Sequence, residues 1–242
     1  MTGARSDPVR GPSESPPATF RGFLSQLKRR GSGLLVTGET PAWVQQHASR
    51  KLFGATRLRA DEPQRRRVVV RTDSAVDPAK YLPTGTEVDD ELVRVVSHTP
   101  PTRSAAAAQP TGFDVAGPTI SDSPDELAAS VVETIESLVA VDGDVEAGEL
   151  RLGVTSLRPL VETSGVDATV AFCTTVTEAV RSHGGMAHFH YPVGEVDALV
   201  LNLDDHLDAR IDLRQDGGTP VQCRWYTPYP ALNEELGWVD FG

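Results

Sequence analysis

The feature that most constrains the fold is a series of short, continuous apolar runs. They cover residues 33–38, 67–72, 150–157 and 186–191 (GLLVTG, RVVVRT, LRLGVTSL and MAHFHY), and residues 91–97 add a further strand. Strands that are buried on both faces read as continuous runs, because helices cover both sides of a parallel sheet. The pattern therefore predicts an open, mostly parallel α/β sheet.

Segments between and after these runs complete the architecture. Helical spacing of apolar residues predicts helices over residues 20–30, 40–52, 123–141 and 166–182. Thr40 is expected to be the N-cap of the second helix and Pro41 its first residue, since a hydroxyl and a proline favour those positions. Further strands are predicted at residues 198–203, 209–215 and 221–226, with a hairpin turn at Asp216-Gly217. We therefore expect a three-layer α/β domain with antiparallel strands at its C-terminal edge.

The chain divides into a tail and one domain. Residues 1–18 are rich in Pro, Ser, Gly and Arg, which predicts a disordered tail, and residues 19–242 are expected to form the single domain. Within it, residues 99–123 form a low-complexity segment that predicts a long loop.

The charge balance is strongly acidic, with a net charge of −11 from 34 acidic and 23 basic residues. Scarce lysine (Lys28, Lys51 and Lys80) and abundant Ala, Val, Gly and Thr indicate a salt-loving organism, because carboxylates hold water when salt screens their repulsion. An ordinary acidic protein from a high-GC bacterium is the alternative. The acidity argues against a nucleic-acid partner.

The sequence contains neither an apolar run of membrane-spanning length nor a secretory signal. We therefore expect a cytoplasmic location and no membrane partner.

Several stretches together resemble one branch of the P-loop ATPases. These are GSGLLVTGETP at 31–41, RRRVVVRTD at 65–73, LRLGVTSLRPLVE at 150–162, the helix and strand of 168–191, and the closing segment 198–230. Their order resembles the RecA/KaiC-like proteins, and more narrowly a group of haloarchaeal proteins that lack the Walker motifs. The resemblance covers most of the chain from residue 20 to 242. It implies a first strand that enters a phosphate loop, a later strand that ends in a magnesium-handling aspartate, and closing antiparallel strands.

The residues at the phosphate-loop position depart from that pattern. A working loop reads Gly-x-x-x-x-Gly-Lys-Ser/Thr, whose lysine and hydroxyl serve the phosphates and the magnesium ion. Here Gly38 is followed by Glu39-Thr40-Pro41-Ala42-Trp43-Val44, with neither the second glycine nor the lysine. Glu39 would repel a phosphate, and Pro41 lacks an N–H donor. Thr155 stands where the resemblance implies the aspartate, so we expect no ATP hydrolysis, no catalytic residues and no cofactor.

Three functions are compatible with a degenerate loop. The first is a non-catalytic RecA/KaiC-like domain that acts in regulation or signalling through contacts with an unknown protein partner or by self-association. The second is binding of a small molecule or nucleotide, without hydrolysis, in the altered cleft at the strand edge. The third is a DNA-associated protein of the recombinase type. The candidate cleft positions are Gly38, Glu39, Thr40, Pro41, Thr155, Ser156 and His190.

Other candidate groups are weaker signals. His188 and His190 alternate along one strand and could ligate zinc, but no third ligand is evident and no metal site is predicted. The acidic residues 204–208 are expected in a solvated hairpin turn. Cys173 and Cys223 are expected to be buried free thiols, and Ser32 and Ser156 lack a nucleophile motif.

The arginine-rich runs at residues 28–30 and 65–67 are expected to pair with carboxylates. The aromatic residues of the last 20 positions are expected to pack the closing strands or to form an exposed docking patch.

Overall fold

The protein is described by a computed structural model that covers residues 19–54, 64–98, 119–121, 123–140, 145–194, 197–235 and 237–241. The predicted tail at 1–18, residues 99–118 and residue 122 of the predicted loop therefore lie outside the described residues. The strands are β1 (Ser32–Thr37), β2 (Arg66–Arg71), β3 (Val93–His98), β4 (Thr119–Ser121), β5 (Leu150–Val154), β6 (Met186–His190), β7 (Ala209–Arg214), β8 (Gln222–Tyr226) and β9 (Val239–Asp240).

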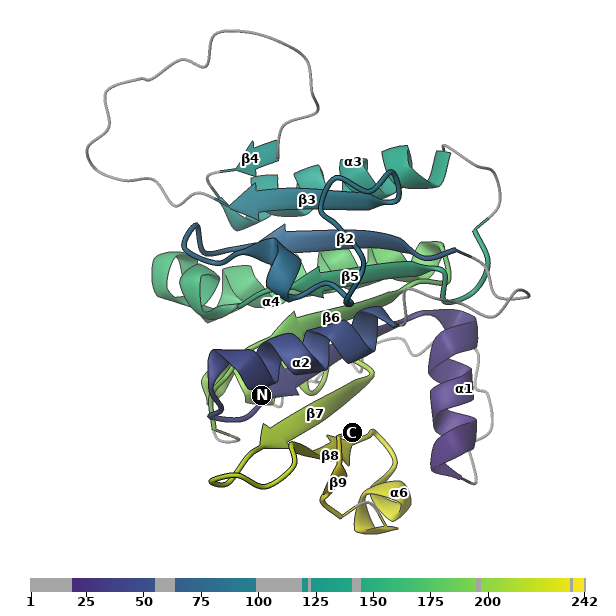
Figure 1. Ribbon diagram of the computed structural model, residues 1–242, viewed down its shortest axis with the longest axis vertical. Helices are drawn as coiled ribbons and strands as arrows, with labels where there is room; N and C mark the ends of the chain where they lie inside the picture. The colour runs from purple at the N-terminus through teal and green to yellow at the C-terminus, as the bar shows by residue number, and fades with distance from the viewer. Residues whose placement is uncertain are drawn as a thin grey trace, which may run out of the picture.

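These strands form one nine-stranded sheet in the order β4-β3-β2-β5-β6-β1-β7-β8-β9 (Figure 1). Every pairing from β4 to β7 is parallel, whereas β8 and β9 pair antiparallel at the end. The prediction of a mostly parallel sheet with antiparallel strands at the C-terminal edge is confirmed.

Helices cover both faces of this sheet. They are α1 (Phe20–Arg30), α2 (Ala42–Phe53), α3 (Pro124–Ala140), α4 (Arg158–Ser182), α5 (Ala198–Leu203) and α6 (Pro230–Glu235), with a short 3-10 helix at Pro78–Lys80. α1 and α2 pack on one face, and α3, α4 and α5 pack on the other (Figure 1). The arrangement is a three-layer α/β fold.

The strand predicted at residues 198–203 is wrong, because this segment is α5. The Asp197 carboxylate accepts a hydrogen bond from the Leu199 N–H at 2.9 Å, which caps a helix. Leu199, Val200 and Leu203 are all buried at helical spacing. A strand would turn Leu199 and Val200 to opposite faces. The acidic residues that follow form the turn from α5 into β7, not a hairpin turn.

Three other local predictions need correction. Pro41, not Thr40, takes the N-cap position of α2, and Thr40 turns its hydroxyl toward the Gly38 carbonyl. α4 begins at Arg158 and kinks at Gly165, whose φ of 83° is outside the helical range, so the predicted start at residue 166 misses its first turns. Thr119–Ser121 forms the edge strand β4, although the composition of that segment predicts a loop.

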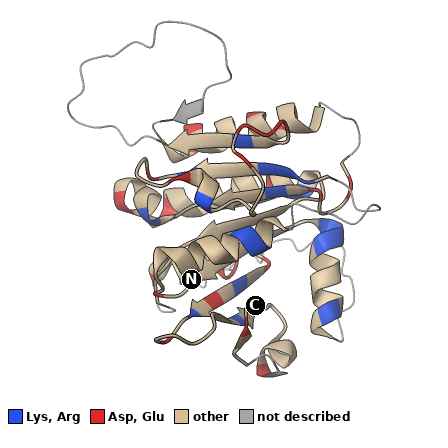
Figure 2. Ribbon diagram, viewed as in Figure 1, with Lys and Arg blue, Asp and Glu red and all other residues tan. Residues whose placement is uncertain are grey.

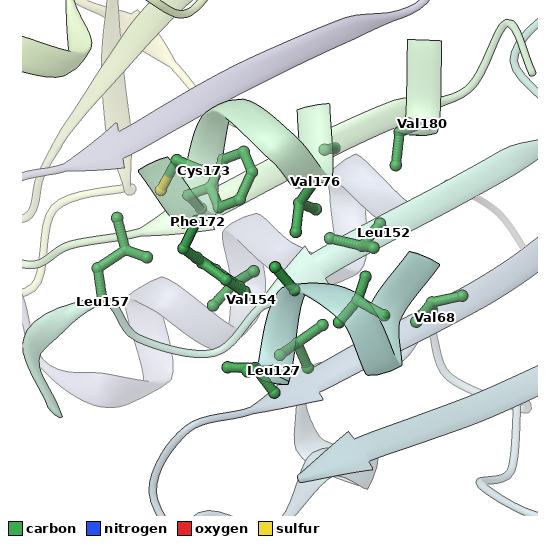
Figure 3. Close-up of a cluster of buried hydrophobic side chains, with 14 of the residues drawn as sticks. Val68, Leu127, Leu152, Val154, Leu157, Phe172, Cys173, Val176 and Val180 are labelled. Carbon is green, nitrogen blue, oxygen red and sulfur yellow. The ribbon is translucent and has the colours of Figure 1, made fainter. Parts of the chain in front are cut away.

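Two main apolar cores fill the layers. The larger lies between the sheet and helices α3, α4 and α5, where Val68, Leu152 and Val154 meet Phe172 and Val176 (Figure 3). A second core joins α1 and α2 to β1, β7 and β8. A smaller cluster under the C-terminal end of α2 consists of Phe53, Val69, Leu82 and Val93. Within the described residues, no helix is both long and apolar enough to cross a membrane.

Asp208 ties together three elements at the N-terminal edge of the sheet. Its carboxylate accepts a hydrogen bond from the Gly33 N–H of β1 at 2.8 Å. It also pairs with Arg30, the last residue of α1, at 2.8 Å, and with Arg181 in the last turn of α4. Asp208 is 7% exposed, so part of the predicted solvated acidic turn is buried structure.

We expect Asp208→Asn to lower the free energy of unfolding by about 1–3 kcal/mol, because one buried carboxylate serves an N–H and two guanidinium groups. The measurement is urea unfolding in molar KCl. Asp205→Asn is the matched control, since Asp205 is exposed in the same turn. Equal effects of the two substitutions would show that Asp208 is not a structural anchor.

Candidate functional site

The loop after β1 is held tightly at the C-terminal edge of the sheet. Gly38 adopts a φ of 106°, and a Cβ atom there would lie 2.0 Å from the Leu213 carbonyl oxygen of β7. Its N–H donates to the Val193 carbonyl at 3.1 Å. In a working phosphate loop, the backbone N–H groups turn toward the ligand. The Gly38 N–H is instead used within the protein.

The side chains that follow Gly38 do not form an anion cradle. Glu39 is exposed and carries a negative charge at the loop. The Thr40 N–H donates to the Gly38 carbonyl at 2.8 Å, and Pro41 has no N–H to offer. The predicted departures at Glu39 and Pro41 therefore coincide with a loop whose donors turn inward.

The lysine and hydroxyl positions of the motif lie on α2. Counting from Gly38, the Gly-x-x-x-x-Gly-Lys-Ser/Thr spacing puts Trp43, Val44 and Gln45 at the last three positions. Val44 is fully buried in the core between α2, β1 and β7. Gln45 is 3% exposed, and its amide donates to the Gly38 carbonyl at 3.3 Å and to the Thr40 hydroxyl at 2.8 Å. The Gln45 side chain thus fastens the loop after β1 to helix α2.

His190 completes this network from the end of β6. Its Nδ1 lies 2.8 Å from the Gln45 Oε1. Because the Gln45 amide nitrogen already donates twice, its oxygen accepts, so the His190 Nδ1 carries the proton and the Nε2 is an acceptor. The Nε2 is buried and has no hydrogen-bond partner within the described residues. Burial lowers the pKa of His190 to about 3, so the ring is neutral at ordinary pH.

His188 lies on the same side of β6, as the alternation predicts. Its Nε2 is 3.0 Å from the Ser49 hydroxyl of α2, and its ring packs against Phe53 with centroids 4.8 Å apart. Burial and the neighbouring His190 lower its pKa well below the usual value. Among the described residues, no group of three or more His, Cys, Asp or Glu side chains could hold a metal ion. The two histidines instead anchor α2 to the sheet.

Thr155 and Ser156 follow β5 at the same edge of the sheet, on the side of β6 that faces away from β1. Their hydroxyl groups form hydrogen bonds with residues outside the loop after β1. The Thr155 hydroxyl accepts from the Thr72 N–H at 3.3 Å, and the Ser156 hydroxyl accepts from the Arg158 N–H at 3.2 Å. The Leu157 N–H donates to the His190 carbonyl at 2.7 Å, which holds this segment beside β6. The predicted cleft positions therefore lie in two hydrogen-bonded groups. One joins Gly38, Thr40 and His190 through Gln45, and the other joins Thr155 and Ser156 through Thr72. The backbone bond from Leu157 to His190 connects the two groups.

Gln45 connects the members of the first group and Thr72 those of the second, and sequence reasoning missed both. The signal for Gln45 is its place at the serine or threonine of the phosphate-loop motif. Thr72 ends the second apolar run and gives no comparable signal. A shallow hollow of about 500 Å³ lies between α4 and α5, and none of the seven predicted cleft residues lines it.

The remaining candidates have structural roles. Cys173 and Cys223 are buried free thiols, as predicted, and burial raises the pKa of Cys223 to about 11. Phe20 packs on Trp225 and Phe23 on Tyr229, so these closing aromatic side chains pack against α1. Arg66 pairs with the buried Glu149 at 3.1 Å, as expected of the arginine run.

Comparison with known protein families assigns the chain to one of them. It belongs to a family of unknown function, DUF7504. The family model matches residues 31–213, which include the loop at Gly38, the end of β5 and His190. The match ends within β7, so β8 and β9 lie beyond it. No curated protein matches this DUF7504 chain.

We expect Gly38→Ala to destabilise the fold by about 2–4 kcal/mol, because the new methyl group meets the Leu213 carbonyl and the residue keeps a positive φ. Thermal unfolding in molar KCl measures the effect. Gly217→Ala is the control, since nothing lies within 4 Å of a Cβ there. A stable Gly38→Ala protein would mean that the loop is not held as tightly as the contacts indicate.

Acid should destabilise the protein through its buried histidines. The folded pKa of His190 is about 3 and the unfolded value is near 6.5, so the unfolded chain binds protons first as pH falls. The stabilisation is complete above pH 6.5 and is lost progressively toward pH 3, by about 2 kcal/mol for His190 at pH 5. Urea unfolding at pH 7.5 and pH 5 measures the change.

His190→Gln should reduce this loss at pH 5, whereas His206→Gln should leave it unchanged because His206 is exposed. An unaltered pH dependence in His190→Gln would contradict the assignment.

Proposed function

We propose that this chain is a non-catalytic domain of the RecA/KaiC type that acts through protein contacts in regulation or signalling. The observation that carries the proposal is the closed loop after β1. Gln45 bonds to both Gly38 and Thr40, and Val44 is buried in the core where the motif has its lysine. A phosphate would have to displace these contacts and would then meet Glu39.

The order of the sheet supports the RecA/KaiC-like part of this proposal. β1 enters the loop, β6 is its neighbour, and β5 with Thr155 at its end is next. The loop and the end of the implied acidic strand therefore share one edge of the sheet, where open α/β folds bind ligands. The antiparallel β8 and β9 correspond to the closing strands that the resemblance implies.

The exposed side chain at this edge supports contacts with a protein. Trp43 takes the place of the second glycine of the motif and is 50% exposed in the first turn of α2. A large ring there prevents close wrapping of the backbone around a phosphate. Exposed tryptophan is also the residue type that most often anchors protein interfaces.

The test is calorimetric titration with ATP and magnesium in molar KCl, together with a phosphate-release assay. We expect neither saturable binding nor turnover above the protein-free rate, because the donors and the charge of a working loop are missing. The double variant Val44→Lys and Gln45→Thr should not restore turnover, since position 44 points into the core. Turnover that falls on Glu39→Gln or Thr155→Ala would overturn the proposal.

One observation favours a second function, namely binding of a small molecule without hydrolysis. The buried Nε2 of His190 is an acceptor with no hydrogen-bond partner in the described part of the chain. A donor group of a ligand that entered between the two bonded groups of the edge would satisfy it. In a thermal-shift panel of nucleotides, a stabilisation that His190→Gln abolishes would favour this function over the first.

A further inference from the structure

The antiparallel end of the sheet carries an alternating stack of arginine and aromatic side chains. In spatial order the stack runs Arg214, Trp238, Arg224, Tyr226, Arg210. Successive guanidinium-to-ring distances are 4.2, 5.3, 4.6 and 4.1 Å. We call these five side chains the arginine-aromatic face.

The register of the strands explains why these residues gather on one face. Arg210 lies opposite Tyr226, and Asp212 lies opposite Arg224 in the antiparallel pair of β7 and β8. Side chains two residues apart share a face, so Arg210, Asp212 and Arg214 alternate with the buried Ile211 and Leu213. The opposite face of the same strands packs on α1. On the polar face Arg210 and Asp212 are buried, and Arg214 is partly exposed.

This face is preorganised and partly open to solvent. Arg214, Arg224, Tyr226 and Trp238 are each partly exposed. Stacking on a ring restricts a guanidinium group, so less conformational entropy is lost when a partner binds. Trp, Tyr and Arg are also the residues that contribute most binding energy at protein interfaces.

The face is far less acidic than the chain as a whole. Its three arginines are matched in number by Asp204, Asp212 and Asp240, whereas the whole chain has a net charge of −11. Arg210 lies 3.8 Å from Asp212 and 3.5 Å from Asp204. The described contacts of the Arg214 guanidinium are with neutral groups, namely the Gln222 oxygen and the Trp238 ring. A carboxylate from outside would give Arg214 a charged partner.

We propose that the arginine-aromatic face docks an extended, carboxylate-rich segment of a partner protein. Diagonal neighbours on adjacent strands, such as Arg214 and Arg224, lie about 7 Å apart, and so do alternate side chains of an extended peptide. Both rings already contact two guanidinium groups, which leaves them poorly placed to stack nucleic-acid bases. The inference rests on the proposed action through protein contacts and adds the surface and the partner chemistry.

The test uses a fluorescein-labelled ten-residue peptide of alternating glutamate and threonine, with binding to the full chain followed by fluorescence anisotropy. We expect saturable binding and no binding of the same peptide with glutamine in place of glutamate. Arg214→Gln should weaken binding about tenfold, the equivalent of one charge-assisted contact. Arg29→Gln, which removes an exposed arginine from α1, should change it less than about twofold. Arg214→Lys keeps the charge but loses the planar fork, so its affinity should fall between those of the wild type and Arg214→Gln.

Several outcomes would overturn the inference. Absence of binding, or binding that Arg214→Gln leaves unchanged, excludes the face as an acidic-peptide site. Displacement of the peptide by a thymidine oligonucleotide of equal length would assign the face to nucleic acid. Self-association in sedimentation that Arg214→Gln abolishes would assign it to a second copy of the chain. Each of these results leaves the nucleotide assay of the proposed function unaffected, so the two proposals can fail separately.

Discussion

The structure depends on the complete burial of β1 within a parallel sheet. All six residues of Ser32–Thr37 are buried, with β6 on one side and β7 on the other. A strand in that position needs partners for its backbone on both edges and apolar cover on both faces. The helices of the two outer layers supply the cover, and the crossovers of the parallel strands require helices between them. The three-layer arrangement follows from this constraint.

Burial of this kind makes any polar group near β1 depend on internal partners. Asp208 meets the requirement at the N-terminal edge with an N–H and two guanidinium groups. At the C-terminal edge, His190 and Gln45 bond to each other, and Gln45 bonds onward to the loop. The same network that stabilises the edge consumes the donors that a phosphate site would offer. One set of hydrogen bonds therefore both stabilises this edge and occupies the donors of the loop after β1.

The parallel and antiparallel parts of the sheet differ in the residues that they carry on their faces. The parallel strand β2 carries Val68 and Val70 on one face and Val69 on the other, and all three are buried. β7 is paired antiparallel with β8, and its buried Ile211 and Leu213 alternate with the charged Arg210, Asp212 and Arg214. The ribbon of β7 accordingly shows both blue and red positions (Figure 2). An antiparallel end can leave one face polar and accessible, because no crossover helix is required there. This difference places the arginine-aromatic face at the C-terminal end of the chain.

Much of the fold follows from the sequence by itself. Continuous apolar runs identify β1, β2, β5 and β6. The sequence also shows that the segment after Gly38 lacks the lysine and the second glycine of a phosphate loop. Local periodicity also predicts α1, α3 and the hairpin of β7 and β8, because these elements depend on neighbours in the sequence. Residues 198–203 mislead that reasoning, since a short apolar run does not distinguish a strand from one helical face.

Only the tertiary structure decided how the candidate site is built. The bond from His190 to Gln45 spans 145 residues, and that from Thr155 to Thr72 spans 83. Contacts of such separation depend on strand order and register, which leave no local pattern in the sequence. The stack of Arg214 on Trp238 has the same origin, because it exists only when β9 pairs with β8. Sequence determined which residues could not serve a phosphate, and the packing of distant segments determined what those residues do instead.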